Sequence, residues 1–318
     1  MQPLNHTSRY ASTSISGWSA FLPPNVLTNT ELEKRLDTTD EWIRERTGIR
    51  ERRVGGKTSD MAVEAGRRAI TLAGIEPSNI KMLVLATTTP DHIMPSTGSI
   101  VHHRLGLSGA SFDINAVCAG FVHAYIVANS MMSTMDIDTA IVIGSDCLSS
   151  LTGSDDRTTT ILFGDGAGAV ILNKVTKKTY SGILGADMGT DGSGYDLLFC
   201  PHQGTIEMEG QEIFRRAVRV TVASATRALE LAGMKAGDIS LFIPHQANYR
   251  IIQAVCERMG IAEDHTAVTI ETTGNTSAAS IPIALSTALD EGRVSTGDTI
   301  LMSGFGAGMS WSSVVVRL

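Results

Sequence analysis

An internal duplication constrains the fold more than any other feature of the sequence. An apolar segment that begins at Met82 corresponds to one that begins at Leu241, 159 residues later, and short apolar runs around Ile141 and Ile300 share this offset. Each half then ends on a glycine-rich segment and an apolar strand, FGDGAGAVIL and GFGAGMSWSSVVV. A fixed offset between similar segments indicates that one supersecondary unit is used twice.

The two copies predict a pseudo-symmetric molecule with two halves, residues 1–175 and 176–318. Apolar strands alternate with helical segments in both halves, which is typical of layered α/β architecture. The offset falls from 159 to 140 between Gly166 and Gly306, so the first half carries an insertion that includes SSLTGSDDRTTT. A polar insertion of this kind is usually a surface excursion near a binding site.

Composition argues against several classes of protein. The chain has 318 residues, 42% of them hydrophobic, and its net charge of −7 argues against a general nucleic-acid binder. The four cysteines form no CxxC pair, so we expect neither a zinc site nor a disulfide framework, and a reducing cytoplasm is the expected compartment. We see no signal-peptide pattern, and no apolar run approaches the roughly 18 residues that a membrane crossing needs.

Cys118 lies in DINAVCAGFVH, between an apolar strand-like run and an almost wholly apolar helix. Free N–H groups and the dipole at a helix N-terminus favour negative charge, so we expect a lowered thiol pKa and a nucleophilic thiolate. An inert buried cysteine is the commoner fate of a lone thiol. The offset of 157 residues from Cys118 to Asn275, however, places an amide at the matching turn of the second half.

His245 and Asn275 would meet Cys118 if equivalent turns of the two halves face each other. His245 follows an apolar strand and Pro244, so its imidazole is expected at a strand end, where it can exchange protons near neutral pH. Asn275 opens a helix, where an amide either caps the helix or donates to a developing oxyanion. His123 and the other histidines show no metal-ligand spacing.

These three residues are compatible with two reactions. A cysteine hydrolase would use His245 as its base and Asn275 to orient that base. A condensing enzyme would hold an acyl group on Cys118 while neutral His245 and Asn275 donate to a carbonyl that becomes an enolate. The apolar neighbours Phe121 and Tyr125 favour condensation, because a hydrolase must admit water.

Six motifs occur in order along the chain: TTDEWIRERTGI, VCAGF, FGDGAGAV, PHQANYRI, GNTSAAS and GFGAGMSWSS. From about Ser14 to Leu318 the sequence resembles the β-ketoacyl-acyl-carrier-protein synthase III family of the thiolase superfamily. The resemblance implies a five-layered αβαβα fold, usually a homodimer. It also implies a decarboxylative Claisen condensation of an acetyl or other short acyl group from acyl-CoA with malonyl-acyl carrier protein, with no metal or redox cofactor.

The same resemblance assigns roles to residues around the thiol. Cys118 would be the acylated nucleophile, and His245 and Asn275 would act on the malonyl thioester. Backbone N–H groups of Cys118 and Ala307 would hold the oxyanion. Phe305 would favour departure of the carboxylate.

Substrate contacts are also implied. CoA would be bound by Trp42, Arg46 and Arg157. The indole would stack on adenine, and the guanidiniums would contact its base or phosphate groups. Met94 stands where many relatives carry an aromatic residue that crosses the dimer interface to cap the acyl pocket, so the preferred starter acyl group is left open. Further residues of the substrate channel would be Thr38, Asn248 and Phe214.

An acidic carrier protein needs a local basic face on a chain of net charge −7. Arg215 and Arg219 lie four residues apart in FRRAVRV, hence on one face of a helix. By the resemblance Arg250 is a carrier-docking arginine, whereas Glu257 stands where relatives often carry a base. We expect the three arginines to dock the carrier protein.

Three other functions are alternatives to this condensation. A paralogous synthase of a secondary-metabolite pathway would share the triad and differ in its starter or acceptor. A catalytically silent acyl-binding partner would have lost the nucleophile, which is present here. A hydroxymethylglutaryl-type synthase would need a carboxylate base near the cysteine, for which we find no sequence motif.

Overall fold

Two sheets of the same plan form the frame of the molecule. The computed structural model describes residues 10–175 and 181–318. The first sheet has the order β1-β7-β6-β4-β5, and β6 is antiparallel to β7 but parallel to β4. Its strands are β1 (Thr13–Phe21), β4 (Met82–Ala86), β5 (Ala110–Ile114), β6 (Thr139–Cys147) and β7 (Asp165–Lys174).

The second sheet repeats this arrangement with the order β11-β12-β13-β8. Here β12 is antiparallel to β13 and parallel to β11, as β6 is to β7 and β4. One sheet therefore draws on the chain before residue 175 and the other on the chain after residue 181, whereas a boundary at 175/176 stays a prediction. The strands are β8 (Gly182–Gly194), β11 (Leu241–Pro244), β12 (Thr299–Gly306) and β13 (Gly308–Arg317).

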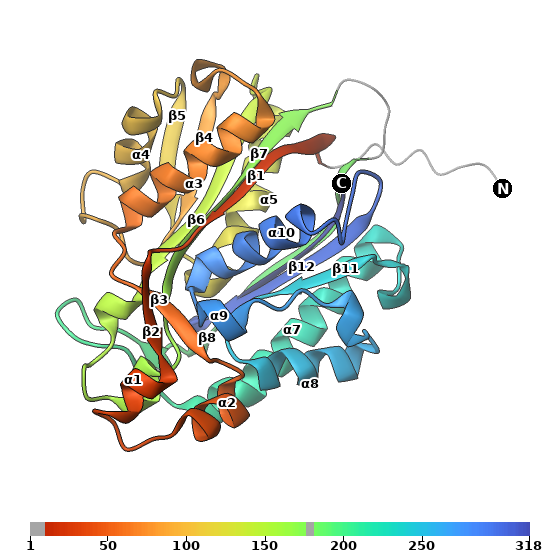
Figure 1. The fold of residues 1–318 in the computed structure, drawn as a ribbon. Helices are drawn as coiled ribbons and strands as arrows, with labels where there is room; N and C mark the ends of the chain where they lie inside the picture. The colour runs from red at the N-terminus through yellow and green to blue at the C-terminus, as the bar shows by residue number, and fades with distance from the viewer. Residues whose placement is uncertain (1–9, 176–180) are drawn as a thin grey trace.

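Helices complete five layers, α on β on α on β on α (Figure 1). The outer face of the first sheet carries α3 (Thr58–Ala73) and α4 (Thr97–Leu105). The outer face of the second sheet carries α7 (Gly210–Ala232) and α8 (Tyr249–Met259). Between the sheets lie α5 (Gly120–Thr134) and α10 (Ser280–Asp290). This is the predicted αβαβα fold.

Side-chain patterns explain which helices lie inside. Sheets cover α5 from both sides, and its buried residues, such as Phe121 and Tyr125, therefore point in several directions around the helix. In contrast α7 buries one stripe that includes Ile213 and Ala217 and exposes its charged face. Within the described ranges, no helix combines the length and apolar character that a bilayer crossing requires.

Shorter elements cover the end of the sheets that carries the site. The pair β2 (Asn25–Thr28) and β3 (Glu51–Val54) flanks α1 (Asn29–Glu33) and α2 (Asp40–Thr47). The insertion folds as a 3₁₀ turn (Leu148–Leu151) and α6 (Arg157–Thr160). The remaining elements are β9 (Leu198–Phe199), β10 (Glu207–Met208), α9 (Ile270–Thr273) and 3₁₀ turns at Pro77–Asn79, Ala236–Asp238 and Glu263–His265.

A buried arginine ties the insertion to the N-terminal segment. Arg52 on β3 is fully buried, and its guanidinium donates to Asn29 Oδ1 at 2.8 Å and to the carbonyl oxygen of Ile161 at 2.7 Å. Burial lowers the pKa of Arg52 to about 10, so the side chain stays charged at neutral pH. These bonds connect β3 to α1 and to the end of the insertion. Arg52 also packs against Gly274, the residue before Asn275, where an added Cβ atom would lie 2.9 Å from the Arg52 Cβ atom.

The equivalent turns of the two halves correct the sequence alignment. Strand β5 leads into the 3₁₀ turn η2 (Val117–Ala119), α9 leads into the 3₁₀ turn η6 (Ser277–Ala279), and each turn continues into a helix between the sheets. Both turns start on a non-glycine residue with positive φ, 48° at Val117 and 51° at Ser277. The true counterpart of Cys118 is therefore Ala278. Asn275 matches Asn115, and both asparagines accept a hydrogen bond from the amide two residues ahead.

Candidate active site

Cys118, His245 and Asn275 line one cavity of about 190 Å³. All three are at most 5% exposed, so the cavity is largely shielded from water. The pseudo-symmetry brings them together, since η2 and η6 contact each other and His245 follows β11 in the second sheet. Apolar side chains make most of the remaining wall: Leu162, Phe163, Leu198, Met208, Ile213, Phe214, Ile251 and Phe305.

Glycines of β12 let the turn with the nucleophile sit directly against the opposite sheet. A Cβ atom at Gly306 would lie 2.8 Å from the backbone nitrogen of Cys118, and one at Gly304 would lie 3.0 Å from Cα of Ala119. Only glycine fits this separation without displacing the Cys118 backbone. The strand therefore fixes the position of the thiol at the start of α5.

Burial raises the pKa of the Cys118 thiol to about 12. The sequence-based expectation of a lowered pKa is therefore wrong. The cause is that loss of water around the thiolate outweighs the hydrogen-bond donors beside it, including the Ser277 hydroxyl and the Cys118 amide itself. The thiol is therefore protonated at neutral pH and has to lose its proton when it reacts.

His245 is held as a neutral hydrogen-bond donor. Its Nδ1 lies 2.7 Å from Ser280 Oγ, and the Gln246 N–H donates to the same oxygen at 3.4 Å. We assign Ser280 as the donor to Nδ1 and the imidazole proton to Nε2, which lets the Ser280 oxygen accept from the Gln246 amide at the same time. Burial lowers the pKa of His245 to about 3. The Nε2 atom is buried and has no partner among the described residues, so it is available to a substrate.

Asn275 and Phe305 complete the wall around His245. The Asn275 carbonyl Oδ1 accepts from the Ser277 amide at 2.9 Å, which leaves the side-chain NH₂ without a partner in the described part of the chain. The Phe305 ring meets the imidazole edge-on, with centroids 5.4 Å apart. The site thus offers a thiol and two neutral donors in an apolar cavity, a combination suited to stabilising an oxyanion or enolate.

A second, outer cavity of about 400 Å³ shares three wall residues with the first. Gly210, Phe214 and Asn248 line both, and Arg46 and Arg250 line only the outer one. Two cationic side chains therefore line the cavity that adjoins the one with the thiol. The remaining wall residue is Gln211.

Asn248 lines both cavities and also links helix α2 to helix α8 by hydrogen bonds. Its Oδ1 accepts from the Arg250 amide at 2.9 Å and caps α8, and its Nδ2 donates to the Arg46 carbonyl oxygen at 3.0 Å. The last turn of α2 is thereby fixed to the first turn of α8. Both arginines of the outer cavity depend on this link for their position.

Trp42 lies on α2 one turn before Arg46. The guanidinium of Arg46 is 4.6 Å from the centroid of the indole ring, and that of Arg157 is 4.9 Å away. Arg157 comes from α6 in the insertion and donates to the Asp37 carbonyl oxygen at 2.6 Å. The three predicted CoA-binding side chains are therefore neighbours. Thr38 lies nearby in sequence, and its buried hydroxyl has no partner among the described residues.

The remaining predicted residues lie further out. Arg215 and Arg219 are exposed on α7, and Arg215 forms an ion pair with Glu212 at 3.4 Å. Met94 is 83% exposed and does not contribute to the wall of the Cys118 cavity in the single chain. Gly306 forms part of that wall and Ala307 follows it, so the oxyanion role of the Ala307 amide stays a prediction.

Several residues of the site were not found from the sequence. Ser280 and Ser277 lie in the GNTSAAS motif, but nothing in a single sequence says that their hydroxyls face His245 and Cys118. Asp146, at the end of β6, has a carboxylate that reaches the turn with Asn275 through the Ala278 amide at 3.1 Å. Among the described residues no cluster of three or more His, Cys, Asp or Glu side chains could hold a metal ion.

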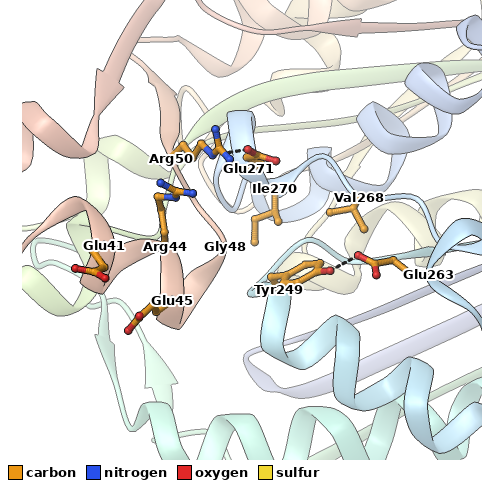
Figure 2. A pocket seen from close by; sticks show the side chains of 10 residues that line it. All are labelled: Glu41, Arg44, Glu45, Gly48, Arg50, Tyr249, Glu263, Val268, Ile270 and Glu271. Carbon is orange, nitrogen blue, oxygen red and sulfur yellow. Dashed lines mark hydrogen bonds and ion pairs between the residues drawn. The ribbon is translucent and has the colours of Figure 1, made fainter.

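A larger depression of about 850 Å³ lies apart from this site (Figure 2). It is bounded by α2, α8 and the segment around α9, and no residue of the triad lines it. Its charges largely pair with local partners, Arg50 with Glu271 at 2.5 Å and Tyr249 with Glu263. Size alone does not therefore identify the reactive cavity.

Comparisons with known proteins identify the family of the chain. A family model described as 3-Oxoacyl-[acyl-carrier-protein (ACP)] synthase III matches residues 112–192, and the model of the C terminal part of these enzymes matches residues 229–318. A relative from Laribacter hongkongensis, Beta-ketoacyl-[acyl-carrier-protein] synthase III, is 45% identical over 316 residues, which is 95% of this chain and 98% of the relative.

Solved structures give the same result. The crystal structure of 3-oxoacyl-[acyl-carrier-protein] synthase III from Aquifex aeolicus VF5 superposes with a TM-score of 0.93 at 43% identity, over 96% of this chain and 100% of that one. The priming β-ketosynthase of the R1128 polyketide pathway superposes with a TM-score of 0.91 at 34% identity, over 99% of each chain.

Fold, site and comparisons together define a condensing enzyme of the thiolase fold, which is an acyltransferase. Within that class the chain belongs to the β-ketoacyl-[acyl-carrier-protein] synthase III family.

Proposed function

We propose that this protein joins an acyl group from acyl-CoA to malonyl-acyl carrier protein and so initiates fatty-acid synthesis. The observation that carries the proposal is the meeting of Cys118, His245 and Asn275 in one small, apolar cavity. An acyl thioester can be held there out of water, and the two neutral donors face the same space. Hydrolysis is disfavoured because the walls exclude the water that it needs.

In the first half-reaction the Cys118 sulfur attacks the carbonyl carbon of acyl-CoA. A new C–S bond forms, the bond to the CoA sulfur breaks, and CoA leaves with the proton that the thiol lost. Backbone N–H groups of Cys118 and Ala307 are the proposed donors to the oxyanion of the tetrahedral intermediate. The reaction uses groups of the chain and the thioester alone.

In the second half-reaction the malonyl thioester loses CO₂ and becomes an enolate. The Nε2–H of His245 and the Nδ2–H of Asn275 donate to the enolate oxygen. Both donors are uncharged, and the other polar atom of each side chain, His245 Nδ1 or Asn275 Oδ1, is already hydrogen-bonded within the protein. The Phe305 ring beside His245 offers an apolar surface that disfavours the carboxylate and favours its departure. The enolate carbon then attacks the acyl-Cys118 carbonyl, the bond to sulfur breaks, and Cys118 leaves as a thiolate that takes up a proton from water.

The outer cavity supports a CoA site beside the cavity with the thiol. Arg46 at its wall and Arg157 both lie against Trp42, which gives a flat aromatic surface with two adjacent positive charges. Adenine can stack on such a surface, and phosphate groups pair with guanidinium. Thr38 is a further proposed contact.

The carrier protein is proposed to dock on the basic face around the outer cavity. Arg250 lines the outer cavity, and Arg215 and Arg219 stand exposed on α7, whose first turn also lines it. Such a surface attracts an acidic partner in spite of the net charge of −7. A homodimer in which Met94 caps the partner's acyl pocket, and a cytoplasmic location, complete the proposal.

Intact-mass spectrometry with a panel of acyl-CoAs tests the loading step. We expect one acyl adduct on the wild-type protein and none on Cys118→Ala, because the other cysteines do not line the cavity. The acyl group that loads fastest identifies the starter. A folded wild-type protein that takes up no acyl group from any thioester would refute the nucleophile assignment.

A further inference from the structure

The side chain of Gln246 is fully buried just beyond the end of β11, directly after the histidine of the triad. Its Nε2 donates to the carbonyl oxygens of Pro244 and Ala267 at 2.7 and 3.1 Å. Its Oε1 accepts from the backbone amides of Thr269 and Ile270 at 2.9 and 3.3 Å. A neutral amide has two donor hydrogens and two acceptor lone pairs, and all four are used here.

These hydrogen bonds make Gln246 the N-terminal cap of α9, the helix before Asn275. Thr269 precedes α9, but its own hydroxyl is buried and has no partner among the described residues. The orphan N–H groups at this helix start are satisfied instead by the side chain from β11. Because only Gly274 separates α9 from Asn275, the position of α9 directly affects that of Asn275.

The segment with Asn275 is held to the end of β11 at both of its ends. After Asn275, the Ser280 hydroxyl oxygen lies 2.7 Å from His245 Nδ1. Before Asn275, the Thr269 amide donates to Gln246. The two residues that follow β11 therefore fix both sides of the turn that carries Asn275.

We propose that Gln246 is a positioning residue for condensation; the inference rests on the proposed function. Its hydrogen bonds fix the segment before Asn275 relative to His245, and so set the separation of the two N–H groups that donate to the enolate oxygen. Such donors act together only when both reach the same atom, and a displacement of about 1 Å can slow a reaction about 100-fold. Gln246 acts through its neighbours, because it does not line the cavity.

Acyl loading does not depend on this arrangement. The proposed oxyanion donors for loading are the amides of Cys118 and Ala307, and Gly306 of β12 fixes the turn with the thiol. The hydrogen bonds of the Gln246 side chain end on Pro244 and on residues 267–270 instead. Loss of this side chain should therefore slow discharge of the acyl-enzyme and spare its formation, whereas a loss of folded protein would reduce both alike.

Single-turnover assays of loading and discharge on the full-length protein test the proposal. Gln246→Met keeps the length of the side chain and removes all four hydrogen bonds. We expect discharge by saturating malonyl-acyl carrier protein to slow about 100-fold, while loading stays within about twofold of the wild-type rate. The carrier concentration that gives half the maximal discharge rate should not change, because the two donors act on the enolate and not on carrier binding.

Gln246→Glu is the second variant and replaces the first if Gln246→Met does not fold. It keeps an oxygen for the amides of Thr269 and Ile270. Burial beside two carbonyl oxygens favours the protonated carboxyl group, which keeps one donor. We expect Gln246→Glu to slow discharge less than the loss of all four bonds does and, again, to spare loading.

Asn129→Ala is the matched control, because Asn129 is another fully buried amide, placed on α5 outside the cavity wall. It donates to the Ala11 carbonyl oxygen at 3.1 Å and to Thr13 Oγ1 at 2.9 Å. Its loss should lower the melting temperature and leave both rates of the folded protein unchanged.

Two results would overturn the positioning role: an unchanged discharge rate in a folded Gln246 variant, or loading that slows as much as discharge. The second result would mean that the side chain supports the fold alone. A wild-type protein that no acyl-CoA acylates would refute the proposed function instead.

Discussion

In the proposed mechanism His245 donates the proton on Nε2, and the Ser280 hydroxyl beside Nδ1 favours that tautomer. The Ser280 hydroxyl accepts from the Gln246 amide and lies 2.7 Å from Nδ1, to which we assign it as the donor. Because burial lowers the imidazole pKa to about 3, protonation of His245 does not limit the reaction at any pH between 5 and 9. A neutral donor with a fixed tautomer is what an enolate oxygen requires.

Ser280→Ala should slow condensation and spare loading. Without the hydroxyl the imidazole can carry its proton on Nδ1, which leaves Nε2 unable to donate. We expect single-turnover discharge of the acyl-enzyme by malonyl-acyl carrier protein to slow about tenfold, less than the 100-fold or more that loss of an oxyanion donor costs. His245→Ala sets the upper limit of the effect. Equal discharge rates in Ser280→Ala and the wild type would contradict the assigned tautomer.

Single residues were the most predictable part of the site, and their pKa values the least. Cys118, His245 and Asn275 were identified from motifs, and the structure places all three in one cavity. The thiol pKa was predicted in the wrong direction, because a helix start is visible in a sequence whereas the depth of burial is not. The hydroxyl of Ser277 escaped notice for the same reason.

At the scale of elements, the two halves lock together by a reciprocal contact. Strand β12 packs against η2, with Gly306 beside the Cys118 amide, and strand β6 packs against η6, with Gly144 beside Ala278. A Cβ atom at Gly144 would lie 2.3 Å from the Ala278 carbonyl oxygen. Each sheet therefore positions a catalytic turn of the other half.

Alanine at these two glycines should separate the half-reactions. Gly306→Ala pushes the Cys118 turn and should slow acyl loading, whereas Gly144→Ala pushes the turn that carries Asn275 and should slow discharge. Each should also lower the free energy of unfolding by about 1–3 kcal/mol through overpacking. Gly237→Ala is the control, since nothing lies within 4 Å of the added atom. Rapid-quench loading and discharge assays would refute the model if both variants slowed the same step.

The register of the turns shows where sequence comparison reached its limit. The strands gave an offset of 159 residues, but the turn was aligned on Cys118 and Asn275, and the structure pairs Cys118 with Ala278. Turn residues lack the hydrophobic periodicity that fixes the register of a strand. The positive φ angles at Val117 and Ser277 show which residues of the two turns correspond, whereas the side chains do not show it.

For the molecule as a whole, the duplication and the six motifs were enough to predict five layers and the family. They did not predict the shape of the outer cavity, where α2, α7 and α8 meet, because it depends on contacts such as that of Asn248 with the Arg46 carbonyl oxygen. The Met94 side chain is exposed and does not line the cavity, so its place at a dimer interface stays a prediction.

The most direct measurement of the central claim is the fate of the acyl group. Protein acylated on Cys118 is freed of acyl-CoA and mixed with one equivalent of malonyl-acyl carrier protein, and the carrier is then analysed by mass spectrometry. We predict β-ketoacyl-carrier that contains the starter, one CO₂ per acyl group and a free Cys118 thiol. Release of the starter as a free acid, with the malonyl group intact, would contradict condensation and identify a hydrolase.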